Sequence, residues 1–334
     1  MPRARRPALA SPVLPSPVLP SPVLVALAVL AALALAITGG AAPASGEPRV
    51  AGPPPPVVPA SVPAAVAAAV PPPVPELPRG GTTIFPRHRV VAFYGTAGTD
   101  ALGVLGEGSP DQAGKRLEEA AAAFATPGRT VLPAMELIAT VANDAPGPDG
   151  DHATDITLDE ARTYLDAARA HRQLLVLDVQ PGRDNFLTAS RVWEPLLREP
   201  DVGLALDPEW RMDPGEVPGE VVGGVAAAEV NAVAEWLAGI VRDERLPEKL
   251  FVLHQVTASM ITEPERLATP EGLAVVQHID GFGAPETKRE KYAQLQRPQQ
   301  LHPGFGLFYD EDTPVLSPAE TLALSPPPDL VTYR

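Results

Sequence analysis

Cysteine is absent from the 334 residues, and basic residues are scarce. The lack of cysteine excludes disulfide bonds, thiolate metal sites, a cysteine nucleophile and a lipid-modified N-terminal cysteine. Only 26 Lys and Arg stand against 41 Asp and Glu, for a formal net charge of −15. Removing residues 1–44 removes three arginines and no acid, which takes the charge from −15 to −18. So acidic a domain argues against nucleic acid as a partner and suits a neutral or cationic one.

Several local catalytic motifs are missing as well. The chain has no Gly-x-Ser-x-Gly, no Gly-x-x-x-x-Gly-Lys, and neither His-x-His nor His-Glu-x-x-His. The run Tyr94-Gly-Thr-Ala-Gly98 follows an apolar stretch but lacks the third glycine and the early helix of a dinucleotide-binding turn. Function must therefore be sought in residues that the fold brings together.

Residues 1–84 differ in composition from the rest. A basic start, the apolar run Val23–Ile37 and the small residues Ala42-Pro43-Ala44 predict a secretory signal over 1–44, or else a membrane anchor. The apolar run is shorter than the about 20 residues of a spanning helix, which favours cleavage. Residues 45–84, rich in proline and alanine, predict a disordered linker of polyproline character or a segment without a role. We therefore expect a secreted or envelope-associated protein, with a membrane tether as a possibility.

Residues 85–334 alternate between apolar strands and amphipathic helices. About 250 residues in this pattern predict one (β/α)8 barrel, a TIM-type barrel, with a doubly wound sheet as the alternative. The expected strands are 89–95, within 129–138, 174–180, 202–210, 249–255, 273–280, 304–310 and 329–333. The expected helices are 111–124, 158–171, 185–198, 226–242, a short one from 263, 285–296 and a short one from 317.

The active site of such a barrel lies at the C-terminal ends of its strands. The polar and aromatic residues that we expect there are Tyr94, Glu136, Asp178, Gln180, Asp207, Glu209, Trp210, His254, Gln255, His278, Asp280, Tyr309, Asp310 and Asp312. Side chains alternate along a strand, so Asp207 and Glu209 are expected on one face. The same argument pairs Asp178 with Gln180 and Asp310 with Asp312.

This ring of acids predicts glycoside hydrolysis, which needs one carboxylic acid and one carboxylate. We assign Glu209 as the acid, with Asp178, Asp207 or Asp310 as its partner. Trp210, Tyr94 and Tyr309 are candidates to stack on sugar rings. The remaining expected substrate-binding residues are Glu136, Gln180, His254, Gln255, His278 and Asp280. No cofactor is expected.

Two other interpretations stay open. In one, His254, His278, Asp280 and Asp178 converge on a divalent ion in a metal-dependent hydrolase, although their spacing matches no metal motif. In the other, the barrel binds a carbohydrate or the cell wall without catalysis. A pocket that lacks a second carboxylate would favour the latter.

Four segments resemble a group of secreted actinobacterial proteins: Leu175–Gly182, Gly203–Trp210, Phe251–Gln255 and Phe308–Glu311. This resemblance covers about residues 88–334 and implies an exported protein without supplying an activity. More distantly, Asp207-x-Glu209 is similar to the Asp-x-Glu of chitinase-like and lysozyme-like glycosidase barrels, in which the glutamate matching Glu209 is the acid. Ala205 and Pro208 depart from that pattern, and the Asn-Glu pair of the large retaining clan is absent. The function expected from the sequence is hydrolysis of an envelope or extracellular polysaccharide.

Overall fold

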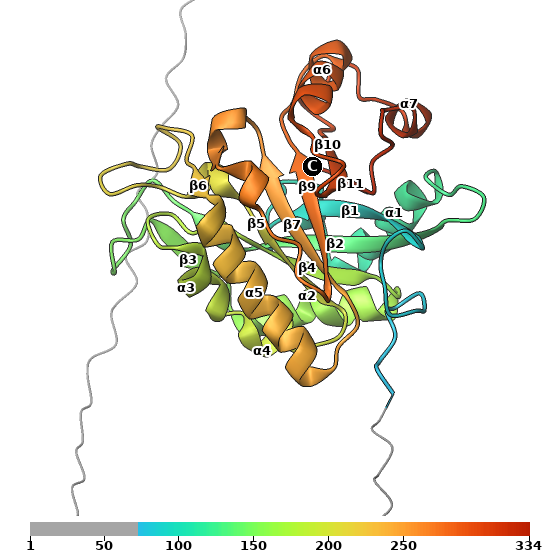
Figure 1. Cartoon of the computed structure of the whole chain (residues 1–334), viewed down its shortest axis with the longest axis horizontal. Helices are drawn as coiled ribbons and strands as arrows, with labels where there is room; N and C mark the ends of the chain where they lie inside the picture. Colours follow the sequence, from blue (N-terminus) through green and yellow to red (C-terminus); the bar gives the residue numbers. More distant parts are fainter. Residues whose placement is uncertain (1–72) are drawn as a thin grey trace, which may run out of the picture. The chain divides into compact units, whose positions relative to one another are not determined.

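Residues 73–334 are the part described by the computed structural model, and eight parallel strands form their centre (Figure 1). Each strand pairs with the next, and β1 pairs with both β2 and β11, so the sheet closes into a barrel. The (β/α)8 prediction is confirmed. The barrel strands are β1 (His88–Gly95), β2 (Thr130–Ala142), β4 (Leu174–Val179), β5 (Val202–Leu206), β7 (Lys249–Gln255), β9 (Leu273–Ile279), β10 (His302–Leu307) and β11 (Leu330–Tyr333).

Apolar side chains cover both faces of these strands, which explains their unbroken hydrophobic sequences. Alternate residues point inward and pack in layers along the barrel axis, among them Val90, Leu132, Val176 and Val252. The intervening residues point outward and pack against the surrounding helices. The inward set becomes polar toward the C-terminal ends of the strands, and this change of character positions the candidate site.

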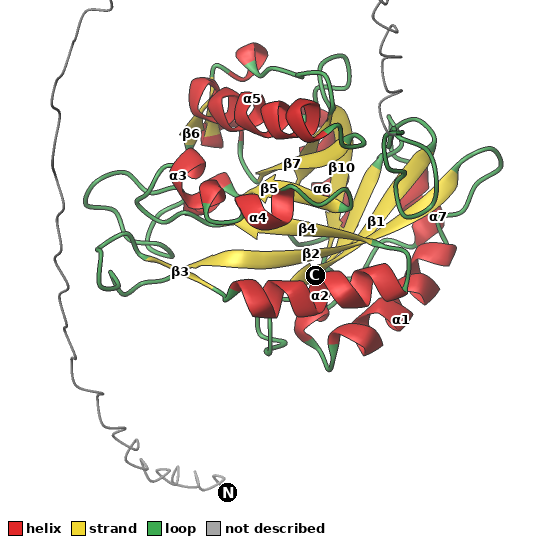
Figure 2. Ribbon diagram, turned by 90° about the horizontal axis from the view of Figure 1, so that it is seen from below, coloured by secondary structure: helices red, strands yellow, loops and turns green. Residues whose placement is uncertain are grey.

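The helices around the barrel begin where their sequences predict. In α1 (Pro110–Ala122) and α2 (Leu158–Ala170), Ser109 and Thr157 cap the first turn in complete capping boxes. These two helices lie side by side on one flank of the barrel, and α5 (Ala227–Glu244) covers another flank (Figure 2). Two further helices, α6 (Pro285–Leu295) and α7 (Pro318–Leu322), follow β9 and β10.

The single helix expected over 185–198 is instead two short ones, α3 (Phe186–Arg191) and α4 (Glu194–Leu197). Proline has no amide hydrogen to donate and fits only the first turn of a helix, so Pro195 marks a restart. Trp193 lies at the break, fully buried, and its Nε1 donates a 3.0 Å hydrogen bond to Thr140 Oγ1. The interruption therefore lets the tryptophan anchor this segment against β2.

Two small pairings extend the sheet structure. Strand β2 runs on past the barrel to Ala142 and pairs there with the antiparallel β3 (Ala153–Asp155). The long loop after β5 returns through β6 (Val225–Ala226), which pairs with β8 (Ile261–Thr262). Both pairings fix loops at the C-terminal end of the barrel.

Packing begins before residue 85, where the barrel domain was expected to start. Leu77 and Ile84 are buried within the core, and Arg79 forms a 2.5 Å ion pair with Glu118. The expected signal segment 1–44 and most of the linker 45–84 lie outside the described residues. Among the helices of residues 73–334, none is both long and apolar enough to cross a membrane.

Candidate active site

The inward-facing side chains at the C-terminal end of the barrel form one polar layer. Each polar residue of this layer lies two positions after an apolar inward-facing residue, so it continues the alternation of the apolar layers below it. These apolar residues are Ala92, Ala134, Val176, Ala205, Val252 and Val276. The polar residues are Tyr94, Glu136, Asp178, Asp207, His254 and His278, and all are nearly or fully buried. The structure thus brings together six of the predicted site residues.

His254 is the centre of a buried charge network. Its Nε2 lies 2.9 Å from Glu136 Oε1, and its Nδ1 lies 2.7 Å from Asp280 Oδ2. Burial alone would lower the pKa of His254, but the charge of Glu136 and the bonds to both carboxylates raise it well above its usual value. A carboxylate at each ring nitrogen favours the protonated imidazole, which donates from both nitrogens.

Arg334, which the sequence analysis missed, completes this network. Its guanidinium Nη2 donates a 2.7 Å hydrogen bond to Asp280 Oδ2, and its Cζ lies over the Tyr94 ring, 3.8 Å from the centroid. Burial would raise the pKa of Asp280, but Arg334 and the two histidines hold it well below its usual range. Arg334 lies two residues after Thr332 and four after Leu330, which face the barrel interior, so the alternation of a strand places it on the same face. This spacing is the signal that would have identified it.

Space for Asp280 and His278 comes from glycine on the neighbouring strand. A Cβ at Gly306 would lie 2.7 Å from Asp280 Oδ1 and 3.2 Å from His278 Cε1. Such contacts are closer than packed atoms tolerate, so β10 contributes no inward side chain at this level. His278 Nε2 meets Thr332 Oγ1 at 2.9 Å instead.

A second group of acids lies beside this network. Tyr94 donates a 2.8 Å hydrogen bond to Asp178 Oδ2, and Gln180 Nε2 donates to the Tyr94 hydroxyl at 3.2 Å. Burial raises the pKa of Asp178 to about 7. Burial and the charge of Glu209 raise the pKa of Asp207 well above its usual value. Both carboxyl groups therefore keep a proton to higher pH than an exposed aspartate does.

The geometry of Asp207 and Glu209 differs from the prediction. Strand β5 ends at Leu206, and Pro208–Trp210 form a 3₁₀ turn, so the alternation that places Asp207 inward does not continue to Glu209. Asp207 is 1% exposed, whereas Glu209 is partly exposed and lines a cavity. Burial and the charge of Asp280 raise the pKa of Glu209. Glu209 thus lies nearer solvent than Asp207.

The cavity at this end of the barrel has a volume of about 230 Å³. Its floor includes Tyr94, Gln180 and Arg334, and its rim includes Trp210 and Tyr309. Tyr309 is 44% exposed and stacks on Tyr333 with 4.9 Å between ring centroids. Asp310 also lines the rim but is exposed.

Several predicted residues lie elsewhere. Gln255 lies at a position of β7 that points outward, away from the cavity. It donates to the Thr257 carbonyl at 3.0 Å and accepts from Gln277 at 2.6 Å. Asp312 does not share a face with Asp310, because it is buried in an ion pair with Lys288. Glu136 is not near the end of β2, which continues for six more residues to Ala142.

A metal centre is weakly supported. His254, His278 and Asp280 offer ligand atoms within 4.8 Å of one another. The Arg334 guanidinium, however, lies 2.7 Å from Asp280 and 3.0 Å from His254 Nδ1, where its positive charge opposes a divalent cation. Asp178, the fourth expected ligand, is not part of this group.

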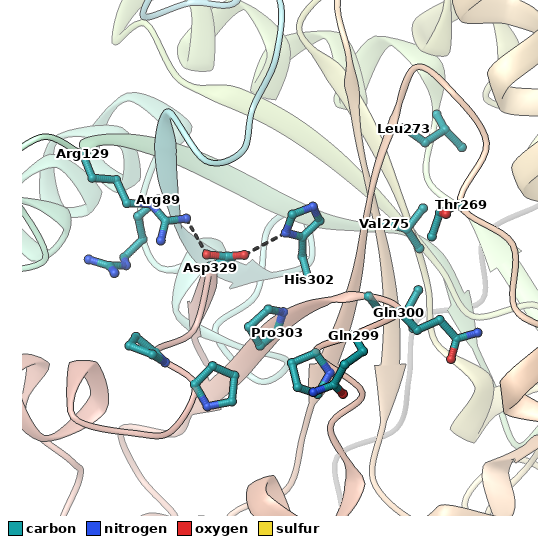
Figure 3. A pocket seen from close by; sticks show the side chains of 14 residues that line it. Arg89, Arg129, Thr269, Leu273, Val275, Gln299, Gln300, His302, Pro303 and Asp329 are labelled. Atoms are coloured by element: carbon teal, nitrogen blue, oxygen red, sulfur yellow. Dashed lines mark hydrogen bonds and ion pairs between the residues drawn. The ribbon is translucent and has the colours of Figure 1, made fainter.

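Another cavity, of about 550 Å³, lies at the opposite, N-terminal end of the strands (Figure 3). The side chains of Asp329 and His302 point toward one another there, with Nδ1 and Oδ2 2.8 Å apart, and Arg129 pairs with the same carboxylate at 2.5 Å. Arg89 donates to the carbonyls of Pro328 and Phe124. These groups are paired with one another, which is typical of the stabilising face of a barrel.

Comparisons with known proteins supply neither a family nor an activity for this chain. No family model and no curated protein matches the chain, so the resemblance to the secreted actinobacterial group stays a prediction. Among solved structures, the chain is similar to dihydrodipicolinate synthase from Bacillus clausii, with 10% identity and a TM-score of 0.31. That match covers 73% of this chain and 67% of the synthase. The barrel assignment itself rests on the strand pairing.

Proposed function

We propose that this barrel hydrolyses glycosidic bonds, with Glu209 as the general acid. The observation that carries the proposal is the position of Glu209, partly exposed on the cavity wall, with the buried Asp207 close enough for the two charges to interact and Asp178 in turn close to Asp207. Glycoside hydrolysis needs one carboxyl group that is protonated near neutral pH and a second carboxyl that attacks or activates water. A raised pKa keeps a proton on Glu209 to higher pH, as the acid role requires.

Asp178 or Asp207 is the partner in this scheme. Asp178 Oδ1 and both carboxylate oxygens of Asp207 are buried and find no hydrogen-bond partner within residues 73–334. An unpartnered buried polar atom costs about 1–3 kcal/mol. If these carboxylates only stabilised the fold, nothing would offset that cost. A ligand hydroxyl or a catalytic water would offset it by forming hydrogen bonds with these atoms.

The aromatic rim supports a sugar as the ligand. Trp210 and Tyr309 line the cavity near Glu209, where their rings offer apolar faces to a sugar. No lysine lines this cavity within the described chain, so covalent catalysis through a lysine Schiff base has no residue there to perform it. The same surroundings suit a barrel that binds a glycan without cleaving it, which is the second candidate.

The substrate that we propose is an envelope or extracellular polysaccharide. This part of the proposal depends on export, for which residues 1–44 carry the predicted signal. It is also consistent with an acidic domain, because net negative charge disfavours anionic partners.

Glu209→Gln tests the proposal. Hydrolysis of whichever soluble glycan the wild type cleaves should fall by about 10²- to 10⁴-fold, because the amide cannot donate the proton. Thermal unfolding should be unchanged, and Glu265→Gln, at an exposed glutamate outside the cavity, should retain full activity. Unchanged turnover in Glu209→Gln would refute the acid assignment. Binding of a glycan without cleavage by the wild type would favour the binding protein.

A further inference from the structure

A second hollow adjoins the candidate active site. It has a volume of about 270 Å³ and is lined by Glu209, Trp210 and the segment Gly219–Val222. The first cavity, of about 230 Å³, is lined by Glu209, Trp210 and residues that belong to or follow β1, β2, β4, β10 and β11. Glu209 and Trp210 are the residues common to both linings, so these two side chains stand at the divide between the hollows.

Each hollow alone is smaller than the about 300–1,000 Å³ of a usual ligand pocket, whereas the two together fall within that range. An acid at the divide would protonate a bond whose two sides lie in different hollows. The arrangement therefore fits a ligand with sugar units on both sides of Glu209 better than one bound in a single pocket.

The wall of the second hollow is held in place. Arg183 Nε donates to the Glu216 carbonyl at 2.7 Å, and Asp213 N donates to the Glu216 carboxylate at 2.8 Å. The amide of Gly223 donates to the carbonyl of Glu209 at 2.7 Å. A Cβ on Gly223 would lie 2.8 Å from that carbonyl oxygen, so only glycine permits this approach. The loop is thus fastened directly to the backbone of the proposed acid.

Two apolar side chains project from this wall. Val221 is 42% exposed and Val222 is 61% exposed, although valine is usually buried. Both belong to the lining of the second hollow, beside Trp210. Adjacent exposed apolar groups at a concave surface are typical of ligand contact, here with the C–H faces of a sugar ring.

The charge of the two linings restricts the ligand. Besides Glu209, acidic residues line both hollows: Asp100, Glu107, Asp310 and Glu311 in the first and Glu220 in the second. Among residues 73–334, Arg334 is the single basic residue of the two linings, and it is paired with Asp280. Uronate or sulfate groups would meet repulsion here, whereas neutral or amino-bearing sugars would not.

We infer that the site binds a chain of neutral or amino sugars that crosses Glu209 and occupies both hollows, so that internal bonds are cleaved. The inference rests on the proposed hydrolysis. Hydrolysis adds one water across the C–O bond and yields two shorter sugar chains, and it needs no other co-reactant.

The first experiment compares chitosan, a soluble neutral β-glucan and polygalacturonate as substrates of the full chain. Cleavage of chitosan or the glucan, with early products of intermediate length, is expected. Preferred cleavage of polygalacturonate would overturn the charge argument. Early release of monosaccharide alone would overturn the internal-cleavage argument. If none of the three polymers is cleaved, this inference fails.

The second experiment uses Val221→Ser/Val222→Ser with six-unit oligomers of the cleaved polymer and an aryl glycoside of its monomer. Loss of the apolar wall should lower kcat/KM for the oligomer by about tenfold, while the aryl glycoside changes by less than about twofold. Val192→Ser, at a 47% exposed valine at the end of α3, should change neither. Equal rates for all variants, with Glu209→Gln still inactive, would refute the inference and leave the proposed hydrolysis standing.

Discussion

The hydroxyl of Tyr94 donates a 2.8 Å hydrogen bond to Oδ2 of Asp178, from one barrel strand to another across the interior. This bond stabilises the ionised form of a carboxyl group that is otherwise cut off from water. Burial, with a smaller contribution from Glu136, still raises the pKa of Asp178 to about 7. Asp178 therefore changes charge in the pH range in which an enzyme of this kind would work.

If ionised Asp178 assists catalysis, kcat/KM should rise with pH around pH 7 as the proton leaves. Tyr94→Phe removes a hydrogen bond to the charged form, so the pKa of Asp178 should increase and this limb of the profile should move to higher pH. The measurement is kcat/KM against pH for both proteins. A Tyr94→Phe profile that coincides with the wild type, or moves to lower pH, would contradict the assignment.

The pair of Glu136 and His254 predicts a large effect on stability. Both groups are buried, and His254 carries a charge that Glu136 and Asp280 compensate. Removing one partner of a buried ion pair typically costs about 3–5 kcal/mol, because the other charge is left without compensation. Glu136→Ala should lower the free energy of unfolding in urea by this amount at pH 7.

Asp159→Ala is the matched control for Glu136→Ala. Asp159 is 94% exposed and pairs with Arg162 at 3.2 Å, so its loss should cost less than about 1 kcal/mol. Similar costs for the two variants would show that the buried network contributes little to stability.

Much of the barrel could be predicted from the sequence, because each strand is an apolar run that ends in polar residues. The period of two also identifies which polar residues face inward once the strand is located. His254 shares the parity of Leu250 and Val252, whereas Gln255 does not. A strict use of parity would have excluded Gln255 from the site and pointed to Arg334.

The remaining errors arise where a strand ends and the alternation no longer applies. Pro208 favours a tight turn, which separates Asp207 from Glu209 in depth. Beyond β10, Asp312 accepts from the amides of Gly283 and Phe308 and pairs with Lys288, which sequence periodicity cannot indicate. Likewise, the second hollow depends on a loop whose course is set by contacts distant in sequence.

Lys249 offers a test at the opposite end of the barrel. Its ammonium donates 2.7 Å hydrogen bonds to the carbonyls of Glu199 and Val202, and burial lowers its pKa from 10.5 to about 7. Between these values the unfolded chain binds a proton that the folded chain does not, so this group's contribution to stability increases as pH rises from 7 to 10.5.

The stability of wild type relative to Lys249→Met should therefore increase with pH, by up to about 1.4 kcal/mol per pH unit between pH 7 and 10. Urea unfolding of both proteins at several pH values gives this difference directly. A difference that is constant over the range would show that Lys249 remains charged in the folded protein.

The choice of the second carboxylate can be tested by comparing Asp178→Asn with Asp310→Asn. Asp310 was a candidate partner on sequence grounds, but it is exposed at the cavity rim, whereas Asp178 is buried on the inward face of the barrel. An exposed carboxylate at the rim would contribute to binding through weak, solvent-screened interactions, so Asp310→Asn should change kcat by less than about tenfold.

Asp178→Asn should lower kcat by about 10²-fold or more if Asp178 attacks the sugar or activates water. The reverse order of the two losses would transfer the partner role to Asp310, and full activity in both variants would leave Asp207 as the remaining candidate partner of Glu209.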